Sequence, residues 1–397
     1  MAEIDSPKAI APAWHRPCPV CGADHPQPLF DNRMTPLDGL DMSYRVGRCP
    51  DCDFCYACDL PLPATYDGYY RLLSKYDVVI GDSAIPPVAA ARIRKTLELC
   101  LPQLPGNALI ADVGCGFGAL LSGFKAAGFS RLYGIDPAPA AGREAARLFG
   151  LDNVSTGSLR DAGSRLPLAQ ADLLCLTGVA EHLPCLNEDF GLLFAQLPAQ
   201  ARVLIEVPAL ERFLAPPVEP FGEFSLEHIQ YFSAATLTRL MAGFGFTACS
   251  ISNSELDGCT DSLFGLFSRG TAGHPAPTPS PARLDDYIAY SAAVRDSAQQ
   301  KIASSSAPFV IFGAGSHTAR LLPQLETLGM TPRIVAIVDN NPNLRGKTLG
   351  NFVVQSSDYL AENPGISVLV SSFNAQEAIA QQLAGRHPTI LLYDAIR

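Results

Sequence analysis

Short apolar runs alternate with longer stretches of mixed polarity through the middle of the chain, between residues 107 and 269. Four of these runs have the length and composition of buried strands: residues 108–113, 131–135, 171–177 and 202–207. The stretches between them are long enough for crossover helices. The pattern therefore predicts an α/β fold with a mainly parallel, Rossmann-like sheet.

A similar pattern returns near the end of the chain. An apolar run at 309–312 precedes Gly313-Ala314-Gly315 and a helical pattern, and further apolar runs follow at 334–338 and 367–370. This repeat of strand, glycines and helix predicts a second, C-terminal Rossmann-like domain. Helices are also expected at 87–101 and 284–303, and the Pro/Ser/Thr-rich tract at 271–281 is the best candidate for a linker.

The overall composition narrows the classes of function. With 48% hydrophobic and 17% charged residues, a chain of 397 residues can bury a sizeable core. The net charge of -10 offers no basic footprint and argues against nucleic acid as a partner. No 18-residue apolar stretch and no secretory signal are found, so we expect a cytoplasmic protein without a membrane partner, whose 12 cysteines stay reduced.

Cysteines cluster near the N-terminus. They form two Cys-x2-Cys pairs, and each pair can supply two thiolates from one tight turn: Cys18 with Cys21, and Cys49 with Cys52. Two such turns close a tetrahedral site, which predicts a structural zinc in an N-terminal zinc ribbon. Cys55 and Cys58 continue the same spacing and leave another ligand set or a second site open, although four thiolates already saturate the ion.

These features divide the chain into five expected parts. They are a zinc-binding domain, a tyrosine-bearing helical connector, an α/β core, a linker and a C-terminal Rossmann-like domain, at residues 1–63, 64–105, 106–270, 271–282 and 283–397.

The strongest chemical signal follows the first apolar run of the core. Residues 112–118 read Asp-Val-Gly-Cys-Gly-Phe-Gly, which places an acidic residue at a strand end and three glycines where the backbone must turn and approach a ligand. Asp136 ends the next strand, where it can accept hydrogen bonds from ribose hydroxyls, and Ser158 and Asp161 follow the third, where they would flank an adenine ring. The expected cofactor residues are Asp112, Gly114, Gly116, Gly118, Asp136, Ser158 and Asp161.

This set resembles the first motif and its companions in class I S-adenosylmethionine-dependent methyltransferases, over about residues 107–269. The likeness extends to residues 178–183, Gly-Val-Ala-Glu-His-Leu, and to residues 205–208, Ile-Glu-Val-Pro. In such enzymes the end of the fourth strand lies beside the reacting methyl group. The resemblance therefore implies S-adenosylmethionine as cofactor and makes His182 a site candidate.

A second candidate segment places Glu227 next to His228, shortly before a helix that is expected to start near Ser233. Histidine can serve as a base near neutral pH, and a neighbouring carboxylate raises its basicity. Adjacent residues of a strand point to opposite faces. Both side chains can therefore reach one substrate only if this segment is a loop.

The order of these parts along the whole chain resembles the zinc-containing sugar C-methyltransferases, which act on nucleotide-linked 4-keto-deoxysugars. The resemblance implies that His228 removes the proton next to the ketone, with Glu227 as its neighbour, and that His182 and a connector tyrosine, Tyr76, line the sugar pocket. Members of that family carry a tyrosine two residues before the glutamate, where this chain has Ser225. A phenol would then have to come from elsewhere, namely from Tyr231, Tyr69, Tyr70 or Tyr76.

Other interpretations stay open from the sequence alone. In the C-terminal unit, Asp339 follows Gly315 at a distance that suits a dinucleotide site, but the third glycine of that fingerprint falls on Thr318, so contact with a nucleotide sugar or a purely structural role is favoured. The alternative functions are an O- or N-methyltransferase acting on a saccharide or natural product, a nucleic-acid methyltransferase, and a non-catalytic scaffold.

Overall fold

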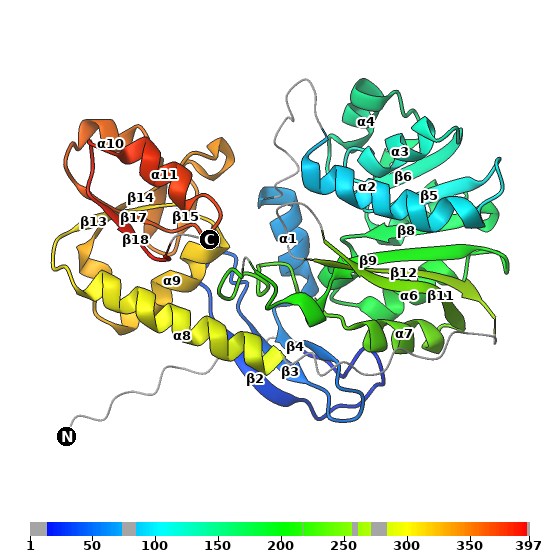
Figure 1. Ribbon diagram of the computed structural model, residues 1–397, viewed down its shortest axis with the longest axis horizontal. Coiled ribbons are helices and arrows are strands. Elements are labelled where there is room, and N and C mark those ends of the chain that lie inside the picture. Colours follow the sequence, from blue (N-terminus) through cyan, green and yellow to red (C-terminus); the bar gives the residue numbers. More distant parts are fainter. Residues whose placement is uncertain (1–13, 74–84, 217, 256–260, 271–283, 395–397) are drawn as a thin grey trace.

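The computed structural model describes residues 14–73, 85–216, 218–255, 261–270 and 284–394, without the side chains of Asp67 and of residues 70–73. Within these ranges the chain forms three sheets (Figure 1). The predicted linker at 271–281 lies outside the described residues. None of the described helices is long and apolar enough to cross a membrane.

The N-terminal sheet is antiparallel and has the order β1-β4-β3-β2. Its strands are β1 (Trp14–His15), β2 (Gln27–Asn32), β3 (Tyr44–Arg48) and β4 (Cys55–Leu60). A distant segment, β10 (Gln230–Tyr231), pairs with Cys55 and Tyr56 of β4, while β1 pairs with Asp59 and Leu60 of the same strand. The loop that contains Glu227 and His228 therefore runs directly into the N-terminal sheet.

The central sheet has seven strands in the order β11-β12-β9-β8-β5-β6-β7. Strands β5 to β9 are parallel, whereas β12 is antiparallel to both β9 and β11. The strands are β5 (Leu109–Val113), β6 (Arg131–Asp136), β7 (Val154–Thr156), β8 (Leu173–Thr177), β9 (Arg202–Pro208), β11 (Phe246–Ser254) and β12 (Ser262–Arg269). The helices are α1 (Pro63–Leu73), α2 (Pro87–Cys100), α3 (Ala119–Ala126), α4 (Ala141–Phe149), α5 (Ala162–Arg165), α6 (Leu186–Phe194) and α7 (Ala234–Gly243).

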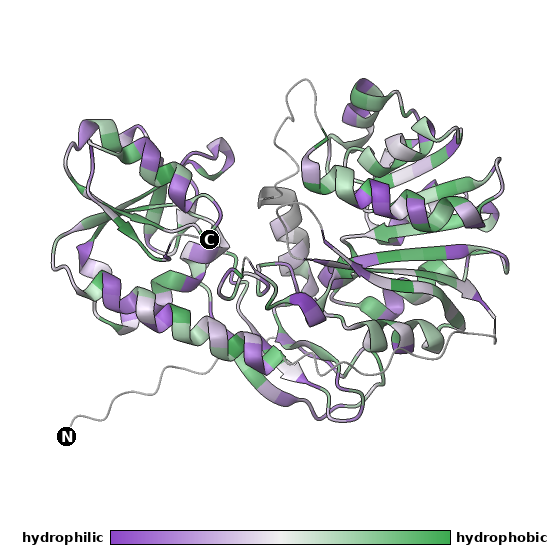
Figure 2. Ribbon diagram, in the orientation of Figure 1, coloured by the Kyte–Doolittle hydropathy of each residue, from purple (hydrophilic) through white to green (hydrophobic). Residues whose placement is uncertain are grey.

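The C-terminal sheet has the order β15-β16-β14-β13-β17-β18 and is parallel except at β15. Its strands are β13 (Phe309–Phe312), β14 (Ile334–Asp339), β15 (Thr348–Leu349), β16 (Phe352–Ser356), β17 (Ser367–Val370) and β18 (Thr389–Leu391). Its helices are α8 (Leu284–Ala303), α9 (Ser316–Thr327), α10 (Tyr359–Glu362) and α11 (Gln376–Leu383). In Figure 2 the strands of the two larger sheets are mostly green, while α2 and α8 alternate between green and purple, as helices with one buried face do.

The predicted α/β class with a mainly parallel sheet is confirmed. The four strands expected in the core form within two residues of their predicted limits, and the helix expected at 284–303 is α8. The antiparallel pair β11 and β12 was not predicted. Its residues include the continuous apolar run 263–267, which looks the same in a buried parallel and a buried antiparallel strand.

A buried arginine joins the N-terminal sheet to the central one. The Arg16 guanidinium donates to the main-chain oxygens of Ala57 at 2.7 Å, Pro184 at 3.0 Å and Ile229 at 2.9 Å. Burial lowers its pKa to about 10, so it stays charged at neutral pH. The bonds to Pro184 and Ile229 fix the N-terminal sheet against the segments that follow His182 and His228.

The C-terminal unit is also attached to the N-terminal one. Leu37 forms a bridge with Leu349, and Lys347 pairs with Asp38 at 2.9 Å. Arg320 of α9 donates to the main-chain oxygen of Phe224. The loop at 224–229 is thus held from both the N-terminal and the C-terminal units.

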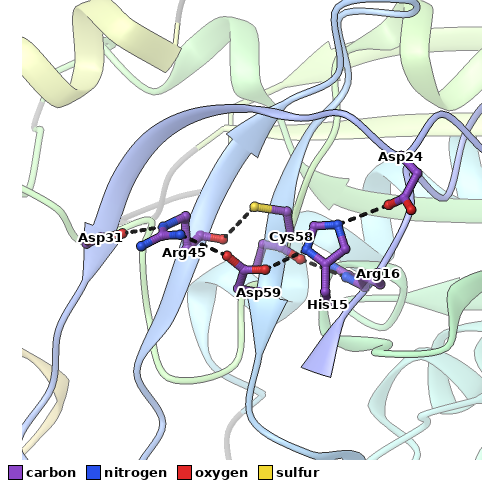
Figure 3. A network of polar contacts seen from close by, with 8 residues as sticks. His15, Arg16, Asp24, Asp31, Arg45, Cys58 and Asp59 are labelled. Atoms are coloured by element: carbon purple, nitrogen blue, oxygen red, sulfur yellow. Dashed lines mark hydrogen bonds and ion pairs between the residues drawn. The ribbon is translucent and has the colours of Figure 1, made fainter. Parts of the chain in front are cut away.

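A network of charges covers the outer side of the N-terminal sheet (Figure 3). His15 lies between two carboxylates, with Nδ1 at 2.6 Å from Asp59 and Nε2 at 3.0 Å from Asp24, while Arg45 bonds Asp31 and Asp59. The hydrogen bond to Asp59, followed by that to Asp24, raises the pKa of His15 above its ordinary value of 6.5. Both ring nitrogens donate when the imidazole is charged.

We expect His15→Gln to destabilise the protein in mildly acidic solution and to have less effect in alkaline solution. A raised folded-state pKa contributes stability below the unfolded value and loses it as the pH rises through the folded value. Because the His15 side chain is 44% exposed, the effect stays below about 1 kcal/mol. Denaturant midpoints at pH 5.5 and 8.5 measure it, with His25→Gln as control. A gap between wild type and variant that grows with pH contradicts the assignment.

Candidate active site

The glycine-rich turn after β5 is built from three residues in the left-handed region. Gly114, Gly116 and Gly118 have φ of +78°, +54° and +84°. A Cβ on Gly114 would lie 2.4 Å from Cγ2 of Val179, and one on Gly118 would lie 2.7 Å from Cδ1 of Leu151. No atom of the described residues lies within 4 Å of a Cβ on Gly116. The outer glycines therefore allow close packing, whereas the middle one faces open space.

Two carboxylates lie beneath this turn. Asp136 accepts the main-chain N–H of Gly116 at 2.7 Å and that of Ala138 at 2.8 Å, so it braces the turn from the neighbouring strand. Asp112 is 1% exposed, and within the described part of the chain neither of its carboxylate oxygens has a hydrogen-bond partner. Burial, followed by the charge of Asp136, raises the pKa of Asp112 to about 7. A buried carboxyl group in this state calls for a polar or positively charged ligand.

Ser158 and Asp161 close the same edge of the sheet after β7. The main-chain N–H and the hydroxyl of Ser158 both donate to Oδ2 of Asp161 at 2.8 Å. These bonds lower the pKa of Asp161. The two side chains are exposed and form a capping box that shapes the turn.

The topology explains why His182 lies near this turn. The strand order reverses between β5 and β8, and ligands of open α/β sheets bind at the carboxyl ends of the strands on either side of such a point. The glycine turn follows β5, and a short 3-10 turn, Ala180–His182, follows β8. The contact of Gly114 with Val179 joins the two loops.

The loop at 224–229 brings a second group of side chains to the His182 turn. The rings of His182 and His228 lie 5.0 Å apart, and Nδ1 of His182 lies 3.2 Å from the main-chain oxygen of Glu227 and 3.8 Å from its Oε2. The segment that contains Glu227 and His228 is irregular and not a strand, as a shared site requires. Three of the four predicted catalytic residues thus meet: His182, Glu227 and His228.

The fourth, Tyr76, lies outside the described residues. The described connector tyrosine at the site is Tyr69 of α1, whose hydroxyl donates to Oε1 of Glu227 at 2.9 Å. The sequence named Tyr69 only as one of several alternatives, because a short helix next to a glycine shows no clear periodicity. Glu181, which is 3% exposed, also belongs to this cluster. The sequence could have indicated it, because Glu181 lies in the segment that follows a strand end.

Ser225 and Tyr231 hold the backbone of the loop at 224–229 by hydrogen bonds. The Ser225 hydroxyl accepts the main-chain N–H groups of Glu227 at 3.2 Å and His228 at 3.0 Å. The buried Tyr231 donates to the main-chain oxygen of His228 at 2.9 Å, and Tyr44 lies 3.1 Å from the same oxygen. Tyr231 therefore holds the backbone of the loop, and serine at 225 forms a turn that a phenol could not form.

A match to a known protein family identifies the domain that contains these strand ends. A family model described as a methyltransferase domain matches residues 88–251. These residues form a class I S-adenosylmethionine-dependent methyltransferase domain. The chain is accordingly a methyltransferase with S-adenosylmethionine as its cofactor.

Solved structures of methyltransferases are similar to this chain over about half of its length. A 1,6-didemethyltoxoflavin-N1-methyltransferase from Burkholderia thailandensis, with S-adenosylhomocysteine bound, is 19% identical, with a TM-score of 0.39 over 56% of this chain and 99% of that one. A SAM-dependent methyltransferase from Anabaena variabilis is 15% identical, with a TM-score of 0.40 over 53% and 96%. No curated protein matches the sequence.

An ion pair joins α2 to the carboxyl end of β9. Arg92 of α2 lies 3.0 Å from Oε2 of Glu206, a residue of β9 that is 1% exposed, and the hydroxyl of Ser262 donates to the same carboxylate. The charge of Arg92 also lowers the pKa of Asp112, against the stronger effect of burial. Sequence analysis quoted Glu206 without a role and did not find Arg92.

The four cysteines predicted to bind metal converge outside the methyltransferase domain. Their sulfur atoms lie within 4.8 Å of one another, with 3.5 Å between Cys18 and Cys52 and 3.4 Å between Cys21 and Cys49. Two similar turns present them, closed by Gly22 N–H to Cys18 oxygen and by Asp53 N–H to Cys49 oxygen. Cys55 and Cys58 lie outside this group of four.

In the C-terminal unit, an aspartate holds the glycine turn by accepting main-chain N–H groups, as Asp136 does in the methyltransferase domain. Asp339 accepts the main-chain N–H groups of Ala314 and Asn341, both at 2.7 Å, as Asp136 does in the first unit. Thr318, where a dinucleotide fingerprint has glycine, donates from its hydroxyl to the main-chain oxygen of Gly313. In this unit the side chains of Asp339 and Thr318 therefore form hydrogen bonds with the glycine turn.

Proposed function

We propose that this methyltransferase transfers a methyl group to carbon in a nucleotide-linked keto-deoxysugar, with His228 as the base. The observation that carries the proposal is the convergence of His182, Glu227, His228 and Tyr69 at the strand ends beside the glycine turn. The choice of sugar rests on the resemblance in the order of motifs along the chain.

The residues of the cradle suit S-adenosylmethionine. Among the described residues, neither buried carboxylate oxygen of Asp112 has a partner, and Gly116 leaves open space where the backbone would meet a ligand. Each oxygen of Asp136 keeps a lone pair for a ribose hydroxyl besides the N–H that it accepts. Gly114 and Gly118 would shape the turn, and Ser158 and Asp161 would flank the adenine ring. When bound, the cofactor supplies an electrophilic methyl group.

The chain's own residues would handle the proton. His228 would accept the proton next to the ketone, which leaves an enolate whose carbon can bond to the methyl group as the carbon–sulfur bond breaks. Glu227 would stabilise the imidazolium that results. His182 and Tyr69 would line the sugar pocket, with Tyr69 in the place that sequence analysis assigned to Tyr76.

The four cysteines are proposed to hold a structural zinc. Sulfur separations of about 3.4–3.5 Å are near the roughly 3.8 Å expected for a tetrahedron with zinc–sulfur bonds of about 2.3 Å. Four thiolates leave no open position for a substrate. Zinc would therefore stabilise the sheet to which β10 is attached and would take no part in the reaction.

The test is an incubation with methyl-13C S-adenosylmethionine and a nucleotide-linked 4-keto-deoxysugar generated in place, followed by carbon–proton correlation NMR. We expect a new methyl signal bonded to carbon that disappears in His228→Gln. An O-methyl signal would instead support methylation of a hydroxyl, which the serine at 225 also permits. No product despite cofactor binding would reject this class of acceptor.

Gly116→Ala is expected to weaken cofactor binding at least about tenfold with a small loss of stability. The added Cβ meets no atom of the described residues within 4 Å, so it would occupy the open space proposed for the cofactor, and a left-handed alanine costs about 1–2 kcal/mol. Calorimetric titration with S-adenosylhomocysteine measures the affinity. The matched control is Gly245→Ala, with φ of +77° and equally open surroundings. Equal affinities in the two variants would place the ligand elsewhere.

A further inference from the structure

We propose that Glu181, His182 and His228 form a second metal site, which takes a divalent transition ion such as Zn²⁺, and that an ion bound there blocks methyl transfer. The blocking effect rests on the proposed function, because it requires His228 to be the base. The binding site itself does not depend on that role.

The three side chains converge as metal ligands do. One donor atom from each lies within 4.8 Å of the others, and Nε2 of His182 is 3.7 Å from Oε1 of Glu181. Ligand atoms around a tetrahedral zinc with bonds of about 2.0–2.1 Å lie roughly 3.4 Å apart. The adjustment that an ion requires is therefore about an ångström, which side-chain torsions can supply.

A neighbouring contact orients His182 toward this point. Its Nδ1 donates to the main-chain oxygen of Glu227 at 3.2 Å, which assigns the proton to Nδ1 and the lone pair to Nε2. Histidine ligands of metals commonly donate their second N–H to a carbonyl or carboxylate in this way. Here Nε2, which carries the lone pair, is the nitrogen that faces Oε1 of Glu181 at 3.7 Å.

Burial and anchoring strengthen the site. The side chains of Glu181 and His182 are 4% and 18% exposed, so a dication would neutralise a carboxylate in a region of low dielectric. The two loops are joined by a hydrogen bond from the Ile229 N–H to the Glu181 main-chain oxygen at 2.9 Å. Arg16, which holds Ile229 and Pro184, restricts both loops further.

The donor set selects the class of ion. Two imidazoles and one carboxylate suit zinc, cobalt, nickel and iron(II), whereas magnesium and calcium prefer oxygen ligands alone. The site also differs from the four-cysteine site, which offers only thiolates. One chain would thus carry two sites of different chemistry.

An ion bound by Glu181, His182 and His228 would occupy the imidazole lone pair with which His228 is proposed to accept the proton. The base must accept a proton on an imidazole nitrogen, and a nitrogen that is bound to a metal cannot do so. If His228 is the base, filling the second site stops the reaction while the cofactor cradle stays intact.

The test counts zinc in the full-length protein after equilibration with micromolar Zn²⁺. We expect two ions per chain in the wild type and one in Glu181→Gln and in His228→Gln, with binding of the second ion weakened at least about 100-fold. His25→Gln, at an exposed histidine, should keep two ions. Retention of the first zinc and of S-adenosylhomocysteine binding shows that each variant is folded.

The outcomes separate the two proposals. A wild type that holds one ion, or a Glu181→Gln variant that holds two, overturns the second site. Methyl transfer should fall as this site fills, with the same dependence on free Zn²⁺, and an unchanged or increased rate overturns the blocking role. Two ions in the zinc-equilibrated protein, together with no methylation of the keto-sugar after the second ion has been removed, would support the site and reject the proposed function.

Discussion

Replacing His228 with glutamine is expected to lower the rate of methyl transfer about 100- to 10,000-fold, the usual contribution of a positioned general base. Glutamine approximates the size of the ring but cannot accept the proton. The main-chain oxygen of His228 bonds Tyr231, and its N–H bonds Ser225, so the loop should keep its shape in the variant. Cofactor affinity should change less than about threefold.

Single-turnover assays with the keto-sugar, together with titration of S-adenosylhomocysteine, measure both quantities. His25→Gln serves as control because it removes an exposed imidazole that pairs with Asp51. Glu227→Gln should lose less activity than His228→Gln, since it affects the charge beside the base. A His228→Gln rate within tenfold of the wild type would assign the proton to another group.

Removing the proposed zinc is expected to open the N-terminal sheet and to abolish methyl transfer while S-adenosylhomocysteine still binds. Structural zinc contributes apparent free energies of about 10 kcal/mol or more. The four-cysteine turns join β1 to β2 and β3 to β4, so loss of the ion would release the two turns from each other at this end of the sheet. The cofactor cradle belongs to the other sheet and should remain.

Cys49→Ser is the variant for this test, and Cys58→Ala is its matched control. Cys58 is equally buried and lies in the same sheet, but its sulfur contacts the main-chain oxygen of Arg45 instead of the other cysteines. After dialysis against metal-free buffer, Cys49→Ser should lack zinc and be cleaved by protease within residues 14–60. Full zinc retention in Cys49→Ser, or zinc loss in Cys58→Ala, would contradict the assigned ligands.

Local patterns in the sequence predicted most helices and strands of the core, but not the contacts between residues far apart in the chain. The glycine turn and Asp136 were predictable because one strand, one turn and the next strand determine their spacing. The meeting of His182 with Glu227 depends on the turn after β8 and on a loop 45 residues later, whose path is set by the pairing of β10 with β4. A two-residue strand with such a distant partner leaves no periodicity to detect.

The tyrosine at the site shows the same limit. Tyr69 and Tyr76 are the same type of residue in the same connector, and the contact of Tyr69 with Glu227 depends on how α1 is placed against the loop. Arg92 was not foreseen for a similar reason, because an arginine on an amphipathic helix usually faces solvent, whereas here it reaches the buried Glu206.

The pairing of β10 with β4 also limits how the enzyme can be divided. A fragment cut at the edges of the methyltransferase match would expose the edge of β10 and release the loop before it, even though its cofactor cradle is complete. Chimeras that exchange the N-terminal unit between related enzymes would need to transfer residues 224–231 along with it. The part of the chain that would have to be exchanged as one piece is therefore discontinuous in sequence: it combines the N-terminal unit with residues 224–231.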